Sequence, residues 1–186
     1  MRRRLVPVMM AVVPGLMAAA PAATADAAGE VVLVRDGVAE IWPIAVHDAE
    51  SPDPNLHFRD FGFVWQASLV ATGPVPDAAL DEDDADDSVP GPSLILTFSG
   101  VNGDIAATEA SIVLTTAPDG RRHVSAEGDA DLVQVDRLDL TEDMAVTAGR
   151  FDAVLCARER VFVAPDPDDC VNVSGRFSAW LPRDDG

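Results

Sequence analysis

The chain has 186 residues, of which 32 are acidic and 13 basic, so that its formal net charge is −19, and every basic residue is an arginine. Each contact with a phosphate normally needs a lysine or an arginine, so this charge excludes nucleic acids and anionic lipids as expected partners. The length is that of one ordinary domain, which is long enough to bury a hydrophobic core.

The first residues have the three parts of a secretory signal peptide. Arginines at 2–4 precede an apolar run over residues 5–20, and small residues at 25–27 supply an A-x-A cleavage site. The apolar run is shorter than the roughly 20 residues that cross a bilayer, and two prolines interrupt it. We therefore predict a signal peptide over residues 1–27 and a single domain over residues 28–186. The mature chain, without a transmembrane segment, would be periplasmic or extracellular, and a bacterial source fits the leader best.

Beyond the leader, short segments that alternate apolar and polar residues recur between glycines, prolines, asparagines and aspartates. This spacing is typical of an all-β protein. We predict a single antiparallel β-sandwich, with a β-barrel as the alternative. The expected strands cover residues 30–35, 39–46, 56–71, 93–99, 107–116, 122–126, 131–138, 145–156, 160–163 and 171–181.

The clearest alternation lies within the segment 56–71. Phe61, Phe63, Trp65, Ala67 and Leu69 recur at every second position. Because successive side chains of a strand point to opposite faces, this set is expected to face the core together.

The pattern G-R-F-x-A-x-L occurs twice, at 149–155 and 175–181, and the only two cysteines, Cys156 and Cys170, lie between the copies. An antiparallel pairing with the cysteines opposite each other would place Leu155 opposite Val171, Ala153 opposite Val173 and Phe151 opposite Gly175. All the apolar residues then share one face, which a register shift of one residue would destroy. We predict an intradomain disulfide Cys156–Cys170, the expected state for an exported protein. Intermolecular pairing or free thiols are the alternatives, and two copies alone do not establish a repeat.

Two acidic clusters raise the question of calcium, which binds six to eight oxygen ligands. The first, at 81–87, belongs to a segment rich in proline and glycine at 72–92, which we expect to form a solvated loop within the domain. The second comprises Asp166, Asp168 and Asp169, close to Cys170. If a calcium site exists, the second cluster is the better candidate, although neither matches an EF-hand loop.

Local signatures of catalysis are missing from the sequence, which has no G-x-S-x-G, H-E-x-x-H, C-x-x-C, Walker A or G-x-G-x-x-G motif. The three histidines are His47, His57 and His123. A dispersed site could still use His57 with Asp60 as base and orienting group, and Ser68 or Ser174 as nucleophile.

Three tryptophans, Trp42, Trp65 and Trp180, are candidates for stacking on sugars. Trp65 belongs to the set expected in the core, and Trp180 lies on the polar face of the segment 171–181, where it would be exposed or would cover one end of the core.

Together these features predict an exported, non-enzymatic binding or structural module of the cell envelope, with a protein or a glycan as partner and no cofactor. A calcium-dependent binding domain and a hydrolase with a dispersed site are the alternatives.

Overall fold

The structure is a computed structural model that describes residues 27–45, 56–74, 91–116, 120–126, 130–160 and 162–184. The predicted signal peptide, apart from its last residue, and most of the segment 72–92 lie outside the described residues. The predictions for the leader, for the loop and for the acidic cluster at 81–87 therefore stay predictions, as does any role of His47.

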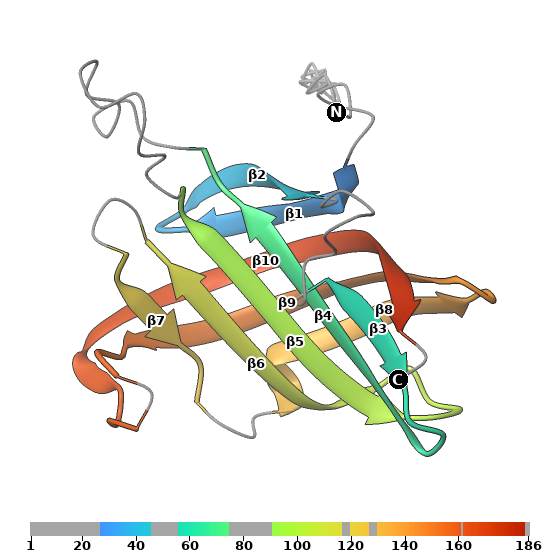
Figure 1. The fold of residues 1–186 in the computed structure, drawn as a ribbon. Helices are drawn as coiled ribbons and strands as arrows, with labels where there is room; N and C mark the ends of the chain where they lie inside the picture. The colour runs from blue at the N-terminus through green and yellow to red at the C-terminus, as the bar shows by residue number, and fades with distance from the viewer. Residues whose placement is uncertain are drawn as a thin grey trace, which may run out of the picture.

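Nearly all the described residues form strands, and the alternating pattern of the sequence is the reason: apolar residues at every second position need a sheet to bury them together (Figure 1). The strands are β1 (Ala27–Arg35), β2 (Val38–Ala45), β3 (His57–Asp60), β4 (Val64–Thr72), β5 (Ser93–Val101), β6 (Ala107–Thr115), β7 (Arg122–Val124), β8 (Val133–Leu140), β9 (Met144–Ala157) and β10 (Asp166–Asp184). A single 3-10 turn, η2 (Ala130–Leu132), precedes β8.

The strands form one mixed sheet in the order β2-β1-β10-β3-β4-β5-β6-β7-β9-β8, with additional pairings of β2 with β4 and of β10 with β9. All pairings are antiparallel except that of β10 with β3, where Arg183 pairs with Phe58. The sheet folds over itself, so that β8, β9 and β10 pass behind β4, β5 and β6 (Figure 1). The two layers are joined by strand pairing, because β10 pairs with β9 as well as with β3, and the choice between a sandwich and a barrel stays a prediction.

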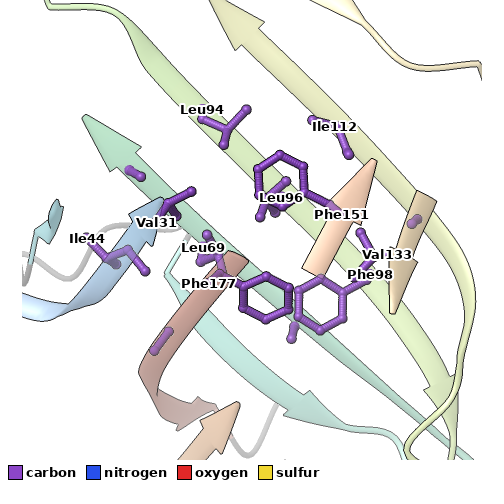
Figure 2. Packing of buried hydrophobic residues seen from close by; sticks show 14 of the residues in the cluster. Val31, Ile44, Leu69, Leu94, Leu96, Phe98, Ile112, Val133, Phe151 and Phe177 are labelled. Atoms are coloured by element: carbon purple, nitrogen blue, oxygen red, sulfur yellow. The ribbon is translucent and has the colours of Figure 1, made fainter. Parts of the chain in front are cut away.

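The core lies between these layers and contains the apolar face of almost every strand (Figure 2). Phe98 of β5 meets Phe177 of β10 with ring centroids 5.3 Å apart, and its other neighbour is Trp65, at 6.0 Å. Edge-on and tilted ring contacts of this kind contribute beyond the area that they bury. The all-β prediction is confirmed.

The disulfide and the strand register around it are also confirmed. Cys156 and Cys170 form a disulfide with their Cα atoms 4.0 Å apart. From this bond the β9–β10 pairing continues without a register shift to Pro182, opposite Met144. The predicted partners are the observed ones: Leu155 with Val171, Ala153 with Val173 and Phe151 with Gly175. The hydrophobic pattern and the cysteine positions were two independent constraints on one register.

The twofold occurrence of G-R-F now has a structural reason. Because the strands are antiparallel, Gly149-Arg150-Phe151 lies against Gly175-Arg176-Phe177 in reverse order, so each phenylalanine faces the glycine of the other strand. A Cβ on Gly175 would lie 2.6 Å from the ring of Phe151, and one on Gly149 would lie 2.8 Å from the ring of Phe177. The two copies are halves of one interlocked cross-strand motif.

Two strand predictions were wrong. The segment 56–71 forms two strands, β3 and β4, because the chain reverses at Gly62, whose φ of +84° few other residues adopt. Phe61 and Phe63 therefore lie in a turn and are exposed, whereas Trp65, Ala67 and Leu69 are buried as expected. Around residues 160–163 the described residues form a turn, with the Val163 amide donating to the Arg160 carbonyl at 3.1 Å.

We predict that Gly175→Ala lowers the free energy of unfolding by about 1–3 kcal/mol, the usual effect of overpacking a core. The new methyl group would meet the ring of Phe151 and the backbone oxygen of Val32, and the latter cannot move without loosening β1 from β10. Urea unfolding measures the change. Ser178→Ala, on the exposed face of the same strand, is the control and should stay within about 0.5 kcal/mol of the wild type. Equal stability of Gly175→Ala and the wild type would contradict the interlock.

Candidate interaction site

Two neighbouring turns at one end of the sheet expose a group of large apolar side chains. We call this group the apolar tip; it consists of Phe61, Phe63, Val64, Val101 and Ile105. Phe63 is the most exposed of the five, with 87% of its surface accessible to solvent. Single exposed apolar residues are normal on a protein surface, but a contiguous exposed apolar patch is a mark of an interaction site.

The tip is contiguous because the β3–β4 turn and the β5–β6 turn lie side by side (Figure 1). Val64 pairs with Val101 at the ends of β4 and β5. The Asn102 amide then donates to the Phe63 carbonyl at 3.0 Å, which ties one turn to the other. The five side chains therefore come from two segments about 40 residues apart that are held together by backbone pairing.

A short network of hydrogen bonds fixes the shape of the β3–β4 turn. The side-chain amide of Asn102 donates to Asp60 Oδ1 at 2.7 Å and to the Gly62 carbonyl at 2.9 Å. The Gly62 amide donates to the same Asp60 oxygen at 2.8 Å. Three donors and acceptors of the turn are thus satisfied locally, so the phenylalanines on either side of Gly62 are presented on a fixed backbone.

The second turn is anchored to the core through Trp65. The indole Nε1 donates to the Asp104 carbonyl at 3.0 Å, and the Asp104 carboxylate accepts the Ala106 amide at 2.9 Å. Trp65 itself is buried and stacks on Phe58, with ring centroids 6.2 Å apart. A surface that is already rigid loses little conformational entropy when it binds.

Asp60 is the charged centre of this network. Its pKa is lowered from the ordinary 3.8 mainly by the hydrogen bond from Asn102, then by that from Gly62, and less by the charge of Arg183, while desolvation opposes the shift. Arg183 Nη2 lies 3.7 Å from Asp60 Oδ2, and Nη1 donates to the Thr141 carbonyl at 2.9 Å. Arg183, near the end of β10, therefore supports the turn that carries Asp60.

Sequence reasoning missed this site because the apolar alternation runs unbroken through Phe61 and Phe63 into the true strand. Period-two patterning cannot distinguish a strand that continues from a hairpin whose turn carries apolar residues. The available signal was Asp60 followed two residues later by Gly62, a pair that favours a turn.

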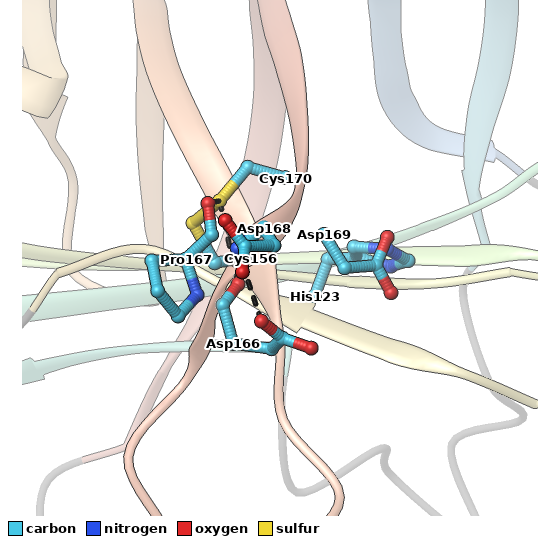
Figure 3. Close-up of a disulfide and its surroundings, with 7 residues drawn as sticks. All are labelled: His123, Cys156, Asp166, Pro167, Asp168, Asp169 and Cys170. Carbon is cyan, nitrogen blue, oxygen red and sulfur yellow. Dashed lines mark hydrogen bonds and ion pairs between the residues drawn. A yellow bond between two sulfur atoms is a disulfide. The ribbon is translucent and has the colours of Figure 1, made fainter.

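The predicted calcium ligands do not converge. Asp166 Oδ1 accepts the Asp168 amide at 3.0 Å beside the disulfide, whereas Asp169 points the other way, toward His123 (Figure 3). Asp169 pairs with Arg121 at 2.6 Å and lies 3.8 Å from His123 Nε2. Within the described residues, no group of three or more His, Cys, Asp or Glu side chains could hold a metal ion. Calcium binding stays a prediction, and the ion pair of Asp169 does not support it.

The residues of the predicted dispersed site are only partly brought together. His57 pairs with Ser68 across β3 and β4, but the Ser68 hydroxyl lies 3.2 Å from that of Thr97. No hydrogen bond between His57 and Asp60 is present in the described part of the chain, since Asp60 is engaged at the tip. Ser174 lies on β10, in a different part of the sheet.

The three tryptophans differ in burial according to the strand face on which each lies. Trp42 and Trp65 are fully buried, which confirms the core assignment of Trp65. Trp180 lies on the outer face of β10, with 56% of its surface exposed. Its indole is therefore available to solvent rather than covering the end of the core.

Comparison with known proteins gives no assignment, because no family model, no curated protein and no solved structure matches the chain. Among the described residues, no helix has the length and apolar character that crossing a membrane would require.

We predict that Asp60 makes the stability of the protein depend on pH below about 4. Because the carboxyl pKa is lowered in the folded state, ionised Asp60 stabilises the fold above the ordinary value of 3.8, and this contribution is lost as the pH falls through the lowered pKa. Urea unfolding between about pH 3 and 5 should therefore show a shallower pH dependence for Asp60→Asn than for the wild type.

Asn102→Ala serves as the second variant, because it removes the largest cause of the shift and leaves the carboxylate in place. Its pH dependence should lie between those of the wild type and Asp60→Asn. An unchanged slope in both variants would mean that this network does not hold the Asp60 carboxylate.

Proposed function

We propose that the chain is an exported, non-enzymatic interaction module of the cell envelope that docks on a protein partner through the apolar tip. The observation that carries the proposal is the exposure of Phe63, 87%, on a turn whose backbone is fixed by hydrogen bonds to the neighbouring turn. Aromatic side chains on a rigid, protruding surface are the usual anchors of protein interfaces, where they fill a pocket on the partner.

The charge of the chain supports a particular kind of partner. A second copy carries the same formal net charge of −19, so association of two copies through these tips is opposed by repulsion. Binding to anionic lipid is opposed by the same electrostatic repulsion. Asp60 and Asp104 lie directly beside the apolar side chains. The partner surface that complements this arrangement is an apolar pocket with a neutral or basic border.

The disulfide and the leader support export. A disulfide persists in the oxidising compartments outside the cytoplasm, and a charged, then apolar, then small-residue N-terminus is what export requires. A β protein stapled by a disulfide is suited to presenting a fixed surface in that environment.

The test places a photo-reactive phenylalanine analogue at position 63 of the protein in the cells that naturally produce it. The same analogue at position 38, where Val38 is also exposed but lies away from the tip, is the matched control. We expect one discrete adduct with a protein from position 63 and none from position 38. The adduct partner is then purified, and its affinity for the mature chain is measured by calorimetry.

Phe63→Ser should weaken that affinity by about 30-fold or more, the effect of losing an interface anchor, whereas Val38→Ser should leave it unchanged. Equal affinity of the wild type and Phe63→Ser would contradict the proposal. So would tip-dependent dimers in sedimentation experiments, or tip-dependent binding to neutral phosphatidylcholine vesicles, because either would make the partner a second copy or a lipid surface.

A further inference from the structure

A second feature, on another face of the molecule, is a groove on the outer side of strands β1, β8, β9 and β10. It is open to solvent and has a volume of about 600 Å³. We call it the arginine groove because Arg150 of β9 and Arg176 of β10 both line it; Val32, Val34, Asp152 and Ser174 are the other lining residues that matter here. Its volume lies in the range of roughly 300–1,000 Å³ that small-molecule sites occupy.

The β9–β10 register places the two arginines directly opposite each other. The Cα–Cα distance of 4.0 Å at the disulfide identifies Cys156–Cys170 as a non-hydrogen-bonded pair, the kind in which side chains lie closest. Pair types alternate along an antiparallel ladder, so Arg150–Arg176, six residues further on, is of the same kind. Both guanidinium groups therefore start from neighbouring positions on the outer face.

The two arginines differ in their partners. Arg150 Nη2 donates to Gln134 Oε1 at 2.6 Å, and Nη1 lies 3.8 Å from Asp136 Oδ1. Arg176 has no ion pair or side-chain hydrogen bond within the part of the chain that the structure describes. One arginine is thus held in place from the β8 side, and the other keeps its donors free.

The two opposed arginines repel each other electrostatically. Like charges directly opposite each other on neighbouring strands are destabilising. The chain has 32 acidic residues for 13 arginines, and other arginines lie within ion-pair distance of a carboxylate: Arg35 with Glu40, Arg121 with Asp169, Arg137 with Asp139 and Arg183 with Asp60. An anion seated between Arg150 and Arg176 would remove the repulsion and satisfy the free donors.

The other lining residues indicate which kind of anion would fit the groove. Val32 and Val34 give the groove an apolar side. Ser174 pairs with Asp152 two residues along the ladder from the arginines, which is the next pair on the same face. A carboxylate beside the anion site repels a highly charged phosphate but accepts hydrogen bonds from hydroxyl groups. A singly charged, planar carboxylate matches the fork of a guanidinium group.

We propose that the arginine groove binds a small hydroxylated carboxylic acid, such as a sugar acid. The carboxylate of the ligand lies between the Arg150 and Arg176 guanidinium groups. Its hydroxyl groups donate to Asp152, and its carbon skeleton packs on Val32 and Val34. This site is independent of the apolar tip, which lies on different strands and contains none of these residues.

The test is a titration of the isotope-labelled mature protein with glucuronate, followed through the arginine Nε–Hε resonances by NMR. Glucose is the matched neutral probe, because it lacks the carboxylate, and acetate is the matched anion, because it lacks the hydroxyl groups. We expect saturable shifts of the Arg150 and Arg176 resonances with glucuronate, none with glucose, and weaker binding of acetate.

Arg176→Gln should weaken glucuronate binding at least about tenfold, since it removes one charged donor pair and keeps a side chain of similar length. Arg122→Gln, at an exposed position of β7 outside the groove, is the control and should bind as the wild type does. The amide spectrum of each variant reports whether it is folded. Equal affinity for acetate and glucuronate would overturn the ligand class, and binding that survives Arg176→Gln, or no saturable shift with any probe, would overturn the site.

Discussion

The pairing of β9 with β10 is the constraint on which the rest of the structure depends. These are the longest strands, and their ladder runs unshifted from the disulfide to Pro182. On the inner face, each phenylalanine of the G-R-F copies lies over the glycine of the other strand, so that the two strands interlock. A slip of one strand by one residue would turn the apolar side chains of that strand to the solvent.

Both candidate sites involve β10. On the outer face its register with β9 sets Arg150 opposite Arg176 and so creates the arginine groove. At the far end of β10, just beyond this ladder, the pairing of β10 with β3 brings Arg183 to Asp60, beneath the apolar tip. In the G-R-F pattern, the glycine and the phenylalanine thus pack on the inner face, and the arginine lines the groove on the outer face. The two surfaces have opposite chemistry, one apolar and one charged, which suits them to different partners.

The chain has 32 acidic residues for 13 arginines, so it matters which charged residues have partners at the two candidate sites. Within the described residues Arg176 has no carboxylate partner, although the chain has a net charge of −19. At the apolar tip the acid is the constrained group instead: Asp60 organises the turn because Asn102 and Gly62 both donate to it.

The disulfide and the β9–β10 register could be predicted because two patterns, the cysteine positions and the apolar alternation, had to agree on one pairing. The apolar tip could not, because Phe61 and Phe63 continue the period of the strand that follows and only the φ of Gly62 breaks it. The groove could not be predicted either. The arginine pair was visible in the repeated motif, but the row that joins it to Val32 and Gln134 depends on the order of β1, β10, β9 and β8 in the sheet.

The most direct test of this account is the NMR measurement of cross-strand Hα–Hα contacts in the mature protein, because Hα atoms lie closest in non-hydrogen-bonded antiparallel pairs. The account predicts strong nuclear Overhauser effects between Arg150 and Arg176 and between Asp152 and Ser174. Contacts that instead join Arg150 to Gly175 or Phe177 would show a register shifted by one residue. That result would remove the glycine–phenylalanine interlock and the arginine groove together.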